Sequence, residues 1–145
     1  MIPNYFCGIN LTINAMNKNS NTKHIDALHF EHQLWLSRAK FYTDELVIYQ
    51  KRLEYIAGRN NKEEVRKQIE HFQNQFIIQE THLSKLNHEV KAHEKFLATF
   101  AENHPIAIDH RLFEDHKLMH ERMNMFKKIY DDLKKEFNAF LSTWM

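Results

Sequence analysis

Residues 25–56 read IDALHFEHQLWLSRAKFYTDELVIYQKRLEYI. Within this stretch, one set of positions follows alternating steps of three and four residues and carries apolar side chains, aromatic side chains or histidine. These positions are 25, 28, 32, 35, 39, 42, 46, 49, 53 and 56. Steps of three and four place all of them on one face of a helix, the pattern of a heptad seam. The stretch therefore predicts one long helix with a continuous buried face.

Two further seams of the same kind follow along the chain. One runs from Val65 to Phe100 and the other from Leu112 to Trp144. Gly58, in the break after the first seam, suits a left-handed cap at a helix C-terminus. Asn103-His104-Pro105 interrupts the pattern a second time, because proline cannot continue a helix interior. Each break predicts the end of one helix and the beginning of the next.

The predicted fold class is all-α, an antiparallel up-down-up bundle of three long helices with heptad seams. Short connections between long helices make neighbours antiparallel. The length of 145 residues, with 43% of them hydrophobic, suits a single domain with a substantial core. The expected helices cover about residues 22–57, 62–102 and 106–144 of a domain spanning residues 22–145.

Residues 1–21 are expected to form a flexible N-terminal tail. Pro3, Gly8 and several asparagines weaken helix formation there. Neither a basic segment nor a continuous apolar segment of the kind found in signal peptides is present at the start. Met16 precedes an ordinary polar lead into the first helix, so the true start of the protein could be Met1 or Met16.

Composition excludes several kinds of partner. Lys plus Arg (20) balances Asp plus Glu (19), which predicts no nucleic-acid partner and no attraction to an anionic membrane. No run reaches the roughly 18 consecutive apolar residues of a membrane span.

The single cysteine, Cys7, cannot form an intrachain disulfide. A cytoplasmic location is the expectation.

Histidines are concentrated in two parts of the chain, since ten of the eleven lie within residues 24–32 and 82–120. When the chain is folded back at the two breaks, residues 29–32, 89–93 and 116–120 come to one level of the bundle. At that level His32, His93 and His116 occupy seam positions, one from each helix. Buried imidazoles need hydrogen bonds or coordination, and one metal ion satisfies all three together.

Neighbouring side chains enlarge this candidate site. Histidine or a carboxylate one helical turn from each seam histidine shares its helix face. Asp115 and Glu31, which lie beside seam residues, are expected to supply further carboxylates. The predicted metal ligands are His29, His32, Glu89, His93, His116, His120 and Asp115. Imidazole nitrogen and carboxylate oxygen suit iron, zinc, copper, nickel and manganese.

A helical bundle with this ligand set resembles the hemerythrin-like family. The fragments that carry the resemblance are His116-x3-His120 and His110-x4-Asp115, while the family's His-x3-Glu appears in reverse as Glu89-x3-His93. The resemblance implies a non-haem di-iron centre that binds or senses dioxygen or peroxide, or a metal store. It also implies four core helices, so a fourth wall would come from the tail or from a second subunit in a homodimer.

The alternative function is a structural or protein-interaction bundle without catalytic activity. In that case the long bundle serves as a rigid spacer or binds a protein partner, and the histidine-rich end is polar or responds to pH. The sequence does not decide whether the protein is an enzyme. No serine or cysteine lies among the histidines and acids in a position to act as an activated nucleophile.

Overall fold

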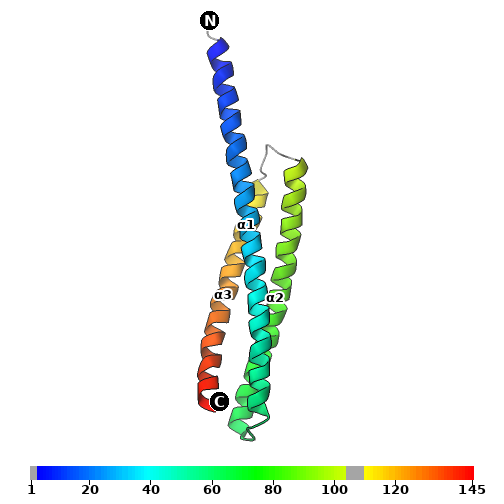
Figure 1. Cartoon of the computed structure of the whole chain (residues 1–145), viewed down its shortest axis with the longest axis vertical. Coiled ribbons are helices and arrows are strands. Elements are labelled where there is room, and N and C mark those ends of the chain that lie inside the picture. Colours follow the sequence, from blue (N-terminus) through cyan, green and yellow to red (C-terminus); the bar gives the residue numbers. More distant parts are fainter. Residues whose placement is uncertain (1–2, 104–109) are drawn as a thin grey trace.

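Three helices form the fold in the computed structural model, which describes the backbone of residues 3–103 and 110–145 and the side chains of residues 25–103 and 112–145. Helix α1 spans Pro3–Ala57, α2 spans Glu63–Asn103 and α3 spans His110–Trp144. Consecutive helices run antiparallel in an elongated bundle, so α1 and α3 run in the same direction (Figure 1). The all-α, up-down-up prediction is confirmed. No helix of the described part is long and apolar enough to cross a membrane.

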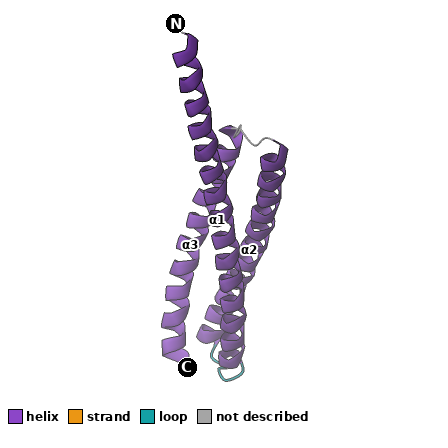
Figure 2. Cartoon of the chain, turned by 45° about the horizontal axis from the view of Figure 1, so that its top comes forward, coloured by secondary structure: helices purple, strands orange, loops and turns teal. Residues whose placement is uncertain are grey.

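Helix α1 begins earlier than the sequence predicted, at Pro3 rather than near residue 22. Its N-terminal part extends past the ends of α2 and α3 (Figures 1 and 2). Proline is tolerated in the first turn of a helix because the amide it lacks has no intrahelical partner there. The division into a flexible tail and a bundle stays a prediction, since the side chains before Ile25 lie outside the described residues.

The turn between α1 and α2 differs in detail from the prediction. Gly58 does not adopt a left-handed conformation, since no described glycine has a positive φ. The carbonyl of Ile56 instead accepts hydrogen bonds from the Arg59 amide at 3.1 Å and the Asn60 side-chain amide at 3.0 Å. These donors satisfy the end of the helix without a left-handed residue. The second predicted turn, at residues 104–109, lies outside the described residues.

The heptad seams form the core, as predicted. The main hydrophobic cluster extends from the α1–α2 turn to Trp35 on α1, Val90 on α2 and Met119 on α3. A smaller cluster of Leu28, Leu97 and Leu112 lies farther along the same seams. The three seam histidines fall between the two clusters on every helix. A polar layer therefore separates the two apolar clusters at one level. Among the described residues, Gln79 on α2 is a further buried polar side chain.

Glu45, a partly buried carboxylate on α1, shows how polar groups are satisfied elsewhere in this bundle. Glu45 accepts hydrogen bonds from Tyr49 at 2.9 Å, Tyr130 at 2.8 Å and Lys134 at 2.5 Å. Burial and the hydrogen bond to Glu45 raise the pKa of Tyr49 to about 12, so its hydroxyl stays protonated and donates. Protein groups alone supply the partners of this network, whereas in the histidine layer the buried His93 Nε2 has no hydrogen-bond partner among the described residues.

Candidate metal centre

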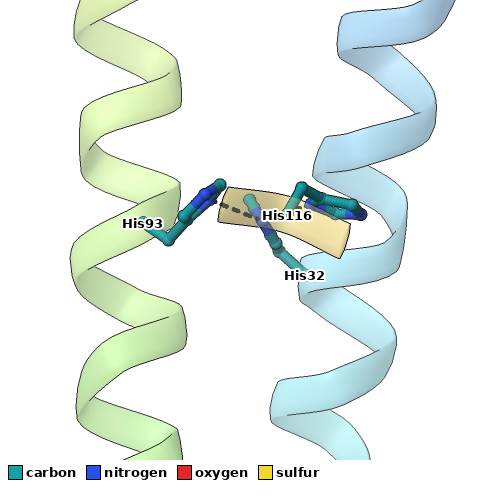
Figure 3. Close-up of side chains that lie close together, drawn as sticks. All are labelled: His32, His93 and His116. Atoms are coloured by element: carbon teal, nitrogen blue, oxygen red, sulfur yellow. Dashed lines mark hydrogen bonds between the residues drawn. The ribbon is translucent and has the colours of Figure 1, made fainter. Parts of the chain in front are cut away.

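The histidine layer contains one imidazole from each helix: His32 on α1, His93 on α2 and His116 on α3. Their rings point toward one another between the helices (Figure 3). His32 is fully buried, His116 is 6% exposed and His93 is partly buried. Each stands at a seam position, where the heptad pattern directs side chains to the bundle axis. The prediction that the fold brings these three together is confirmed.

Two of the three spacings between the imidazole nitrogens suit a single ion. His32 Nε2 lies 3.1 Å from His93 Nδ1 and 3.2 Å from His116 Nδ1. One ring nitrogen from each of the three residues falls within 4.8 Å of the others. With metal–nitrogen bonds of about 2.0–2.1 Å, adjacent ligands are about 2.9 Å apart in an octahedral site and about 3.3 Å apart in a tetrahedral one. The two observed distances lie between these values.

The outer nitrogens of two of these rings are bound by carboxylates. His32 Nδ1 contacts Glu94, and His116 Nε2 lies 2.8 Å from Glu31 Oε2. Histidines that bind metals commonly donate their second N–H to a carboxylate in this way, which fixes the ring and its tautomer. His93 Nε2 is buried and has no hydrogen-bond partner among the described residues.

Burial keeps two of the three rings, His32 and His93, in the neutral form that binds metals. Desolvation lowers the pKa of His32 below its ordinary value of 6.5, although Glu94 opposes the shift. Desolvation also lowers the pKa of His93, and the neighbouring histidines add to the effect. Both rings are therefore neutral at neutral pH, and a neutral imidazole offers one nitrogen lone pair.

An aromatic side chain closes one side of the layer. Trp35 is 4% exposed and stacks on His116 with 4.7 Å between ring centroids and 29° between planes. It also lies 5.5 Å from the His32 ring, centroid to centroid. An apolar wall of this kind excludes water and lowers the local dielectric, which strengthens any electrostatic contact inside.

The other predicted ligands lie around the layer and do not join it. His29 is half exposed and contacts Glu94, and His120 is half exposed with its Nδ1 3.7 Å from Glu31. Arg122 Nη1 lies 2.5 Å from Glu89 Oε2, an ion pair whose angles do not meet those of a hydrogen bond. Asp115 is exposed. Their role as ligands stays a prediction.

Glu94 was missed by the sequence reasoning, although a signal for it was present. It directly follows seam residue His93, just as Glu31 directly precedes seam residue His32. Both side chains flank the seam and reach the imidazole of a neighbouring helix. The rule that identified Glu31 as a nearby carboxylate would have identified Glu94 as well.

Comparisons with known proteins add no family to this picture. No family model matches the chain, and no curated protein and no solved structure matches it. Membership of the hemerythrin-like family therefore has no support from the comparisons. What stands is a bundle of three helices with a cluster of three histidines that could hold a metal ion.

Proposed function

We propose that this protein binds one divalent transition-metal ion through His32 Nε2, His93 Nδ1 and His116 Nδ1. The observation that carries the proposal is the pair of inner nitrogens on His32 and His116, 3.2 Å apart. Each of these rings donates its outer N–H to a carboxylate, so a neutral ring keeps only a lone pair on its inner nitrogen.

Two lone pairs facing each other in a buried layer repel, and a cation between them removes the repulsion. A proton would do so only by charging one of the rings, which burial disfavours for His32. His93 adds a third nitrogen 3.1 Å from the same His32 atom. A metal ion satisfies all three nitrogens at once, as neutral imidazole is a common ligand for zinc, copper, iron and nickel.

Zinc fits this ligand set better than iron. Three histidines with a fourth position for water or another ligand form a common tetrahedral zinc arrangement. Non-haem Fe(II) sites typically use two histidines and one carboxylate bound directly to the metal. Here Glu31 and Glu94 bind the outer nitrogens of the histidines, so they are engaged away from the inner face.

The same contacts favour one ion over two. A di-iron centre of the expected kind needs carboxylates that bridge the ions, and Glu89 is paired with Arg122. A single ion joins all three helices at one level, between the two hydrophobic clusters. Because a metal that binds only the folded chain adds its binding free energy to folding, the ion stabilises the bundle.

A calorimetric titration of chelator-treated protein with Zn²⁺ tests this function. We expect one Zn²⁺ per chain at about pH 7.5. When free zinc is a hundredfold above Kd, the free energy of unfolding should rise by about 2.7 kcal/mol. Affinity is expected to fall below about pH 6.5, because protons then compete for the lone pairs. Because the pKa values of His32 and His93 are lowered, these two rings stay unprotonated above that pH, and the affinity should not decline there.

The same titration with copper, nickel or iron, each added alone under anaerobic conditions, shows which metal binds most tightly. Tighter binding of iron at two ions per chain would replace the zinc proposal with the di-iron one. Absence of saturable binding for every metal would contradict a metal-binding function and leave the structural or protein-interaction bundle.

A further inference from the structure

Two carboxylates outside the histidine layer each contact one buried and one exposed imidazole. Glu94 contacts His32 Nδ1 through one oxygen and His29 Nδ1 through the other. Glu31 Oε2 lies 2.8 Å from His116 Nε2 and 3.7 Å from His120 Nδ1. The exposed histidines, predicted as metal ligands, thus contact the carboxylates that bind the ligands.

These contacts determine which nitrogen of each buried ring carries the proton. A carboxylate only accepts hydrogen bonds, so the nitrogen facing it must be the N–H. His32 is therefore the Nδ1–H tautomer, with its Nε2 lone pair inward. His116 is the opposite tautomer, Nε2–H, with its Nδ1 lone pair inward. Two different tautomers are required to aim both lone pairs at one point.

We propose that Glu94 and Glu31 are positioning residues that select opposite tautomers of His32 and His116 and so aim both unprotonated nitrogens into the layer. The effect of these tautomers on metal affinity rests on the proposed function. The tautomers themselves are a property of the metal-free protein and can be measured without metal. Outer-shell partners of this kind change metal affinity by about 10- to 100-fold.

The two carboxylates contribute unequally. Glu94 engages an imidazole with each oxygen, and its side chain is 20% exposed. Glu31 engages His116 closely and His120 loosely, and its side chain is 41% exposed. The more buried carboxylate, held at both oxygens, restricts its ring more. The effect of removing Glu94 should therefore lie near the upper end of that range and the effect of removing Glu31 near the lower end.

Imidazole ¹⁵N chemical shifts, measured by NMR on metal-free protein at about pH 8, test the proposal, because they distinguish the two neutral tautomers. In the unaltered protein we expect Nδ1–H for His32 and Nε2–H for His116. Glu94→Ala is expected to release His32 from the Nδ1–H form and to weaken zinc binding by about 100-fold. Glu94→Gln should restore the tautomer, because its amide oxygen still accepts the hydrogen bond.

Glu121→Ala is the matched control. It removes a carboxylate that is exposed on α3 and adjacent to His120, and it should change neither the tautomers nor the affinity. Circular dichroism shows whether each variant keeps its helices. An Nε2–H form of His32 in the unaltered protein, or a Glu94→Ala variant with unchanged tautomers and affinity, overturns the inference. If the protein shows the expected tautomers but binds no zinc, the selection of tautomers by Glu94 and Glu31 is upheld and the proposed function is overturned.

Discussion

A chain carrying His32→Leu is expected to fold into the same bundle and to bind zinc at least about 100-fold more weakly than the unaltered chain. His32 is the fully buried member of the layer, and its Nε2 is the atom that both other rings approach. Its loss removes one of three ligands, which costs more than the loss of an outer-shell partner. Leucine suits the seam position, so folding should survive the change.

Equilibrium zinc competition and urea unfolding of the metal-free variant separate the two effects. The unfolding free energy without metal should match or exceed that of the unaltered chain, because an apolar side chain replaces a buried polar one. His88→Leu is the control, as His88 is exposed on α2. A His32→Leu chain that still binds one zinc with unchanged affinity would refute the three-histidine site.

Phe137→Ala is expected to lower the unfolding free energy by about 3–5 kcal/mol without affecting the metal site. Phe137 is fully buried in the main cluster. Its ring centroid lies 4.9 Å from Phe76, 5.0 Å from Tyr49 and 5.1 Å from Phe72. Truncation leaves a cavity that these rigid rings fill only in part. Small domains are stable by about 5–15 kcal/mol, so this loss is large.

Chemical unfolding of metal-free protein measures this effect. Phe41→Ala removes the same atoms from a side chain that is 59% exposed on α1 and should change stability by less than about 0.5 kcal/mol. Equal losses in the two variants would show that the α1–α2–α3 seam is not the stabilising core.

The helical seams could be predicted from the sequence because periodicity alone decides them. Alternating steps of three and four identified residues such as Leu46, Phe76 and Phe137, all of which are buried. Helix ends depend instead on which of several neighbouring residues supplies the hydrogen bonds to the last carbonyl groups. Gly58 was therefore expected in a left-handed cap that Arg59 and Asn60 make unnecessary.

The inner part of the site was also predictable, since His32, His93 and His116 occupy seam positions that the fold brings to one level. The contacts of the surrounding side chains were not predictable, because helical spacing gives a residue's face but not where a long side chain ends. Glu89 shares a face with His93, yet its carboxylate pairs with Arg122 on α3. Glu94 reaches across to α1 and contacts His29 and His32 there.

X-ray absorption spectroscopy of the zinc-loaded protein tests the central claim most directly, because it reports the atoms bound to the metal. The three-histidine site predicts about three imidazole nitrogens at about 2.0–2.1 Å and one further light-atom ligand. The multiple scattering of imidazole rings should be reduced by His32→Leu and unchanged by His88→Leu. A spectrum without imidazole scattering, or with a coordination shell of carboxylate oxygens alone, would contradict the claim.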